Sequence, residues 1–201
     1  MKPASFDSTD QRILDGAAAQ MRRFGTKRMT IVSVAAELGM THANVYRYFP
    51  SKLALQDAVT AQWLKPLEAD LRVSADSPDP AYDKLERVLL VLHRSYRNKF
   101  ADDPHIFDLF AEAVIEGRGV ARKHRNAVQS TLQRIVEEGI AAGSFETSDH
   151  RRALALIFDA MHRFIHPVPV RMDADIPRAF LEQRFERLNT LVVRAIVTGR
   201  P

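Results

Sequence analysis

The stretch TIVSVAAELGMTHANVYRYFPSK, residues 30–52, constrains the fold more than any other part of the chain. Thr30 can cap a helix with apolar residues at helical spacing, and Gly39 can end it because glycine tolerates the left-handed backbone of a sharp turn. Thr41 can then cap a second short helix, which must stop before Pro50 because proline disfavours helical geometry in the preceding residue. Two short helices joined by a glycine turn are typical of a helix-turn-helix, whose second helix enters the DNA major groove.

The basic charge of the chain is concentrated in and just before this motif. The net charge is +4 over 201 residues, yet from Arg22 to Lys52 six cations face the single acid Glu37, so this segment carries +5. A basic cluster alone is usually a solvated face. On a helix-turn-helix, however, it is the electrostatic footprint of a surface that binds phosphates, and it therefore favours double-stranded DNA as the partner.

The motif resembles the TetR family of bacterial transcriptional regulators. The resemblance rests on the opening threonine, an Ala-x-x-x-Gly turn at residues 35–39, a threonine cap, an aromatic-x-aromatic-Phe run at residues 46–49, and the Ser-Lys pair at residues 51–52. Ala43 stands where the family often has glycine, and Leu53 stands where an acidic residue is common. The strong resemblance covers about the first quarter of the chain, and the remainder is similar only in helix count and length.

The resemblance implies separate roles for residues that position DNA and residues that read bases. The side chains expected to hold phosphates are Thr30, Tyr46, Tyr48 and Lys52. Asparagine can pair with adenine, arginine with guanine or a phosphate, and small side chains can touch a thymine methyl. The side chains expected to face the bases are Thr41, His42, Ala43, Asn44 and Arg47. For the two tyrosines, the alternative is that their rings only pack.

Helical spacing continues through the rest of the chain. A long helix should follow Ser51 and join the DNA-binding head to a body, with a kink near Pro66 because proline removes a backbone hydrogen bond and clashes with the preceding turn. The alternative is that the helix breaks there. Residues 74–80, SADSPDP, cannot continue a helix and predict a linker. Five or so further helices should form the body.

These patterns predict an all-α fold of about nine helices, since no β-branched alternation bounded by turns is present. We expect a three-helix helix-turn-helix DNA-binding domain at residues 1–51. We expect a helical effector-binding and dimerisation domain at residues 52–201. The chain has no run of membrane-spanning length and no cysteine. These features favour a cytoplasmic protein without a membrane partner, a disulfide framework or a thiolate zinc site.

The last predicted helix, from about Asp175 to Thr198, has a heptad-like seam typical of helices that pack at a shallow angle. The seam consists of Leu181, Phe185, Leu188, Val192 and Ala195. One interpretation is that the seam faces the chain's own core. Leu191, Val193 and Ile196 add apolar surface beyond a single stripe, and in the TetR family the two C-terminal helices of each subunit form a four-helix dimer interface. Both points favour contact with a second copy.

An effector site is expected between the long helix and the body, because that helix ties the body mechanically to the head. The candidate lining consists of Trp63, Leu67, Tyr96, Phe107, Phe110, Met161 and His162. An aromatic lining with a methionine and a histidine would suit a flat or flexible apolar molecule with one polar group. The alternative is that these residues are ordinary core.

The sequence gives little support for a catalytic, cofactor-binding or metal-binding site. No phosphate-binding loop, dinucleotide fingerprint, GxSxG motif or cysteine nucleophile is present, so no cofactor is expected. His162 and His166 are four residues apart and could face one metal ion, but no third ligand has suitable spacing and His166 precedes a proline. A pair of helix-surface or pocket histidines is the favoured interpretation.

The leading hypothesis is a homodimeric repressor that a small molecule releases from a palindromic operator. One alternative is a DNA-binding protein or activator that needs no ligand. A less favoured alternative is a small helical enzyme that carries the same head. Loss of DNA binding with ligand would support the first, binding independent of ligand the second, and turnover without any operator the third.

Overall fold

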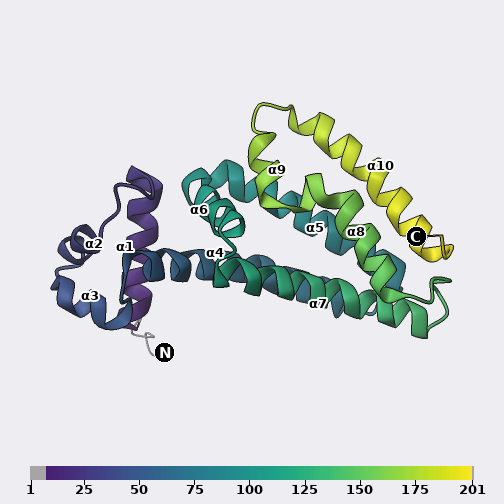
Figure 1. Ribbon diagram of the computed structural model, residues 1–201, viewed down its shortest axis with the longest axis horizontal. Coiled ribbons are helices and arrows are strands. Elements are labelled where there is room, and N and C mark those ends of the chain that lie inside the picture. Colours follow the sequence, from purple (N-terminus) through teal and green to yellow (C-terminus); the bar gives the residue numbers. More distant parts are fainter. Residues whose placement is uncertain (1–7, 201) are drawn as a thin grey trace, which may run out of the picture.

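Ten helices and no strand make up residues 8–200, the part of the chain that the computed structural model describes. The predicted all-α class is confirmed. Figure 1 shows a small head at one end of an elongated molecule, a body of longer helices beside it, and the C-terminus at the end of the body far from the head. None of the described helices is both long and apolar enough to span a membrane.

The head contains three helices around a small apolar centre. They are α1 (Thr9–Phe24), α2 (Ile31–Glu37) and α3 (His42–Tyr48). Ile13, Ala17 and Met21 recur at helical spacing along α1 and are buried against Val34 of α2 and Val45 of α3. The first helix thus packs over the helix-turn-helix, as its spacing predicts.

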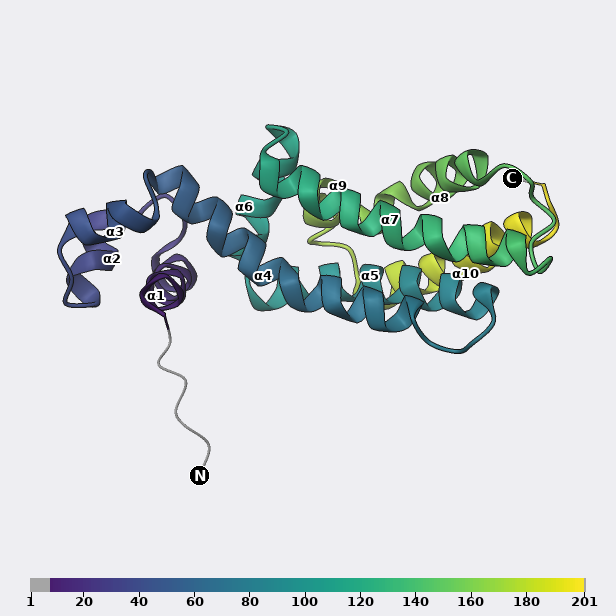
Figure 2. The same ribbon diagram turned by 90° about the horizontal axis from the view of Figure 1, so that it is seen from below.

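Helix α4 (Lys52–Ala75) connects the head to the body. It begins at the Ser51 cap and continues through Pro66 without interruption, so the alternative that it breaks there is wrong. In Figure 2 the helix changes direction where it enters the body. A single continuous helix therefore passes from the DNA-binding motif into the core of the larger domain.

Six helices complete the body. They are α5 (Ala81–Asp102), α6 (Pro104–Ile115), α7 (Gly119–Ala141), α8 (His150–Ile165), α9 (Pro167–Met172) and α10 (Arg178–Val197). The short α9 is the one helix that the sequence did not predict. His166-Pro167 ends α8, but the His166 ring also accepts a hydrogen bond from the Val168 amide, and proline is well suited to a first helical turn.

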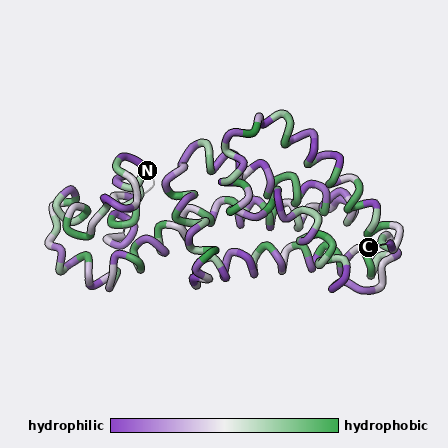
Figure 3. The backbone as a smooth tube through the Cα atoms, turned by 45° about the horizontal axis from the view of Figure 1, so that its top comes forward, coloured by the Kyte–Doolittle hydropathy of each residue, from purple (hydrophilic) through white to green (hydrophobic). Residues whose placement is uncertain are grey.

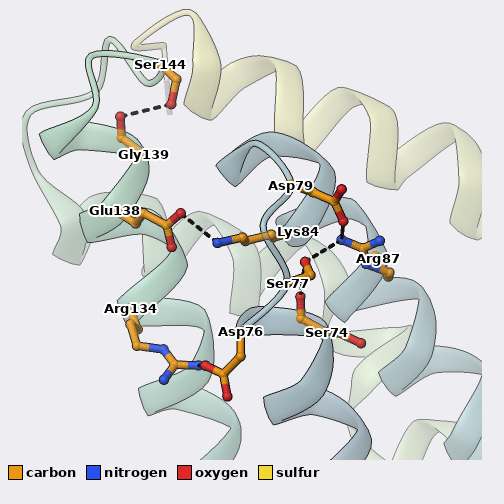
Figure 4. Close-up of polar contacts among 10 residues, drawn as sticks. All are labelled: Ser74, Asp76, Ser77, Asp79, Lys84, Arg87, Arg134, Glu138, Gly139 and Ser144. Atoms are coloured by element: carbon orange, nitrogen blue, oxygen red, sulfur yellow. Dashed lines mark hydrogen bonds and ion pairs between the residues drawn. The ribbon is translucent and has the colours of Figure 1, made fainter.

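Ion pairs fasten the predicted linker after α4 to the helices of the body (Figure 4). The carboxylate of Asp79 and the hydroxyl of Ser77 both accept from Arg87 of α5. Asp76 pairs with Arg134 of α7 at 2.6 Å. The linker is thus held against both α5 and α7.

One apolar core runs from the head through the body. In Figure 3 hydrophobic and hydrophilic residues alternate along the helices, as expected for helices that bury one face. Gly139 of α7 has a packing role, because a Cβ at this position would lie 2.3 Å from the ring of buried Phe145. The glycine therefore lets the chain after α7 fold back onto that helix.

Candidate DNA-binding surface and effector region

The turn between α2 and α3 has the geometry that its glycine predicts. Gly39 has a φ of +65°, and the amide of Met40 donates to the carbonyl of Ala35 at 2.9 Å. Thr41 then caps α3, because its hydroxyl accepts from the Asn44 amide at 3.2 Å. The turn and the cap together fix the direction of α3 relative to α2.

A polar network beneath α2 was not predicted. Thr30 and Ser33 form a reciprocal capping box at the start of α2. The Ser33 hydroxyl donates to Gln20 of α1 at 2.8 Å, and the Gln20 amide donates to Glu37 at 2.7 Å. Gln20 is only 5% exposed. The glutamine on the inward face of α1 could have indicated this network from the sequence, because a buried amide needs hydrogen-bond partners.

The outward face of α3 carries the predicted base-reading and phosphate-binding groups. His42, Ala43 and Arg47 are exposed, whereas Asn44 is half-buried beside its cap. Tyr46 and Tyr48 are 46% and 43% exposed, which leaves a large part of each side chain accessible to solvent. The seven-residue helix therefore presents aromatic, basic and amide groups together on one surface.

Lys52 has a structural contact in addition to its predicted role. Its ammonium donates to the carbonyl of Lys27 at 2.9 Å and so holds the loop between α1 and α2 against the start of α4. An ammonium carries three donors, so this bond leaves donors for a phosphate. The side chain can thus position the loop and still bind DNA.

Asp103, at the junction of α5 and α6, joins the head to the body. Its carboxylate accepts from Arg22 at the end of α1, at 2.5 Å, and from the indole of Trp63 on α4, at 3.0 Å. These bonds lower the pKa of Asp103, and the bond from Arg22 has the largest effect. Lys99 lies 4.2 Å from the Trp63 ring centroid and donates to the Trp63 carbonyl at 2.7 Å. We call the group Arg22, Trp63, Lys99 and Asp103 the head–body clamp.

Six of the seven predicted effector-lining residues are buried in the body. Trp63, Tyr96, Phe107 and Phe110 form edge-to-face contacts, with ring centroids 5.8 to 6.4 Å apart. Leu67 and Met161 are buried in the same apolar core. Trp63 also borders a cleft of about 310 Å³ between α1, α4 and the junction of α5 with α6. We call Trp63, Tyr96, Phe107 and Phe110 the aromatic cluster, and the rings of these residues themselves fill the space between their helices.

His162, which the sequence placed on or beside an inward face, does not belong to this cluster. Its side chain is exposed on α8, and its ring stacks on that of His166 at a centroid distance of 4.5 Å. Burial, with His162 beside it, lowers the pKa of His166 to about 4. Within residues 8–200, no three histidine, aspartate, glutamate or cysteine side chains gather as metal ligands would.

A hydrogen-bonded chain leads from the aromatic cluster to the surface between α4 and α7, and the sequence did not reveal it. Buried His124 of α7 lies 2.7 Å from the carboxylate of Glu68 on α4, through Nδ1, and 2.9 Å from the Tyr96 hydroxyl, through Nε2. This contact with His124 is the main cause that lowers the pKa of Glu68. An ionised carboxylate only accepts, so Nδ1 donates to Glu68, and in a neutral ring Nε2 accepts from Tyr96.

Comparison with known families agrees with the helix-turn-helix geometry. A family model described as bacterial regulatory proteins, tetR family, matches residues 13–59, and one described as the tetracyclin repressor-like C-terminal domain matches residues 81–188, more than half of the chain. The chain belongs to the TetR family. It is thus a member of a class of DNA-binding transcriptional regulators, a class that is not enzymatic.

Solved structures share this fold over nearly the whole chain. A protein with unknown function from Rhodococcus sp. RHA1 has a TM-score of 0.71 at 18% identity, covering 98% of this chain and 100% of that one. A TetR/AcrR regulator from Thermobifida fusca YX-ER1 has a TM-score of 0.67 at 19% identity, covering 92% and 96%. FadR from Bacillus subtilis, in complex with stearoyl-CoA, has a TM-score of 0.59 at 18% identity, covering 94% and 97%. No curated protein matches significantly.

The heptad-like seam of this TetR chain faces its own core for the most part. Leu181, Phe185 and Val192 are almost fully buried within a single chain, and Phe185 stacks on the ring of His93 at 4.3 Å. The prediction that these three residues contact a second copy is therefore wrong, because α5 and α8 already cover α10 on that side. Leu188 and Ala195 of the same seam stay half-buried.

A different face of α10 remains open. It carries Phe180 and Leu191, which are 50% and 61% exposed, beside the half-buried Leu188 and Ala195. Figure 1 shows α10 along the outer edge of the body. The apolar surface available for pairing therefore combines Leu188 and Ala195 of the predicted seam with Phe180 and Leu191 beside it.

Proposed function

We propose that this TetR-family regulator is a homodimeric repressor that leaves a palindromic operator when a small molecule binds its body. The observation that carries the proposal is the exposed face of α3, where basic, aromatic and amide groups follow a correctly capped turn. The proposal assigns DNA binding to residues 1–51, and effector binding and pairing to residues 52–201.

DNA contact divides into two groups of residues in this proposal. Phosphates are held by Thr30, Tyr46, Tyr48 and Lys52 around the rim of α3. Bases are read by the exposed side chains that α3 places in the major groove, with Thr41 and half-buried Asn44 at its first turn. The base-reading residues are Thr41, His42, Ala43, Asn44 and Arg47.

Pairing follows from the size of the recognition helix. Seven residues bury too little surface for useful specificity alone, whereas two such helices on a twofold axis read two half-sites about one helical turn apart or slightly more. The exposed apolar side chains Phe180 and Leu191 on α10 support pairing through the outer face of this helix. Half-buried Leu188 and Ala195 extend that surface.

Release by a small molecule requires a path from the body to α3. The head–body clamp supports such a path, because Asp103 bonds both α1 of the head and Trp63 of α4. A ligand that favours one position of α4 would thus also change the position of the head. It shifts operator binding only if its affinity differs between the two positions. FadR from Bacillus subtilis, in complex with stearoyl-CoA, is one related fold that holds a small molecule.

Operator binding at several salt concentrations tests the assignment of roles on α3. Lys52→Ala should weaken binding to every sequence alike and lower the salt slope by about one unit for each half-site, because it removes a phosphate contact. Arg47→Ala should instead relax the preference at one base position. Arg94→Ala, an exposed cation of the body, is the control and should change neither property. A change of sequence preference in Lys52→Ala would contradict the assignment.

A further inference from the structure

A groove runs between α4 and α7 on the surface of the body. It consists of two adjoining clefts of about 450 and 310 Å³, and Glu68 borders both. The stretch of α7 that lines the groove, residues 119–134, would be about 22 Å long at 1.5 Å per helical residue. The groove is therefore long enough for an extended small molecule.

The apolar side chains of this groove are mostly small. Ala58, Ala61 and Leu64 of α4 face Val120 of α7 in one cleft. Leu71 of α4 and Ala127 of α7 continue the apolar surface in the other. Short side chains on both helices leave the space that the clefts occupy, and such a surface fits an apolar chain better than a bulky ring system.

Three cations border the groove around Glu68. Lys65 and Arg72 lie three residues before and four residues after Glu68, so they share its face of α4, and Lys123 lies opposite on α7. Within residues 8–200, none of the three forms an ion pair at 4.0 Å or less. Their charges exceed that of Glu68 and are available to a ligand.

In contrast to these three residues, the cations at the two ends of the groove form ion pairs. Arg118 pairs with Asp57 at 2.8 Å at one end, and Arg134 pairs with Asp76 at 2.6 Å at the other (Figure 4). These pairs neutralise the ends and leave the unpaired positive charge in the middle. A neutral or cationic ligand would gain nothing from that charge, whereas an anion would.

We propose that the groove between α4 and α7 binds an elongated molecule with an apolar body and an anionic end group. This inference rests on the proposed function in one respect, namely that the bound molecule is the effector. The apolar body lies along the alanines and leucines of α4, and the anionic group pairs with Lys65, Arg72 and Lys123.

The hydrogen-bonded chain from Glu68 connects this groove to the aromatic cluster. His124 links Glu68 to Tyr96, and its ring also makes an edge contact with Phe110 at 5.4 Å. Phe110 in turn contacts Trp63, which belongs to the head–body clamp. A ligand anion would draw the neighbouring cations away from Glu68 and so change the charge around the Glu68 carboxylate. His124 and Phe110, which are buried and lie in direct contact, would transmit the effect of this change to Trp63.

Calorimetric titration of the full-length protein without DNA tests the site, with decanoate and decanol as probes below the concentrations at which they aggregate. Decanoate should bind, and decanol, which lacks only the charge, should bind about tenfold more weakly. The triple variant Lys65→Gln/Arg72→Gln/Lys123→Gln should lose about tenfold or more in decanoate affinity, because each of the three exposed ion pairs contributes a factor of about two to five. Its affinity for decanol should not change, which also verifies that it folds.

A matched pair of single variants locates the site on α7. Lys123→Gln should weaken decanoate binding two- to fivefold, whereas Arg125→Gln, an exposed cation two residues further along α7 and outside the groove, should not. Equal affinity for decanoate and decanol, no binding of decanoate, or equal effects of the two single variants would overturn the proposed site.

Operator binding in the presence of decanoate separates the site from the proposed function. Release of operator by the wild type but less by His124→Phe, at unchanged decanoate affinity, would support both the site and the hydrogen-bonded chain. Charge-dependent binding of decanoate without any change in operator affinity would support the site and contradict its role as the effector site.

Discussion

Replacement of Asp103 by asparagine should loosen the attachment of the head to the body. The carboxylate bonds Arg22 at 2.5 and 3.2 Å and Trp63 at 3.0 Å. Bonds to charged groups contribute about 1.5–3 kcal/mol, but Arg22 is 50% exposed, and solvent screening reduces its share to about 0.5–1 kcal/mol. Because asparagine keeps one acceptor oxygen, we expect Asp103→Asn to lower the free energy of unfolding by about 1 kcal/mol in total.

Urea unfolding followed by the fluorescence of Trp63, the single tryptophan of the chain, measures this loss. The control is Asp102→Asn, an exposed neighbouring carboxylate, which should change the free energy of unfolding by less than about 0.5 kcal/mol. Equal stability of the two variants would refute the argument. Folding lowers the pKa of Asp103, so its contribution is present above the unfolded pKa of about 3.9 and is lost as the pH falls through the lower folded value. The difference between wild type and Asp103→Asn should therefore shrink below about pH 4.

Three further predictions concern packing, pairing and pH. Gly139→Ala should lower the free energy of unfolding in urea by about 1–2 kcal/mol, because overpacking outweighs the gain in helix propensity. The control is Gly119→Ala, which has no atom within 4 Å of the added Cβ and should not lower the free energy of unfolding. Equal effects of the two variants would contradict the packing argument. Leu191→Glu should give folded monomers in sedimentation, and a persistent dimer would exclude this face of α10 from the interface. Burial lowers the pKa of His93 to about 4, so as the pH falls this side chain takes up a proton in the unfolded chain before it does so in the folded one. The free energy of unfolding should therefore fall as the pH drops from about 6.5 to 4. The same pH profile in a His93→Gln variant would contradict this prediction.

The head could be predicted from sequence because its signals are local. Caps at Thr30, Thr41 and Ser51 lie within three residues of the amides that they satisfy, and Gly39 ends its helix within one turn. Such contacts depend on spacing along the chain alone. The helices of the body other than α9 followed in the same way from apolar periodicity, with Pro66 placed inside a continuous α4.

The contacts between distant elements could not be predicted in this way. A heptad-like seam shows that one face of α10 is buried, but not whether α5 and α8 or a second chain covers it, and for Phe185 the answer is its own chain. Periodicity likewise left open whether His162 points into the body or to solvent, and the structure exposes its side chain. Asp103 and His124 join residues far apart in sequence, so neither the head–body clamp nor the chain to Glu68 has a local signal.

Selection of bound fragments from random double-stranded DNA, with the purified full-length protein, tests the central claim most directly. The account predicts one enriched motif of two inverted half-sites, spaced about one helical turn or slightly more, bound by two copies of the chain. Arg47→Ala should lose preference at the same position of both half-sites. Enrichment of a single, unpaired half-site bound by one copy, or no enrichment at all, would contradict the account.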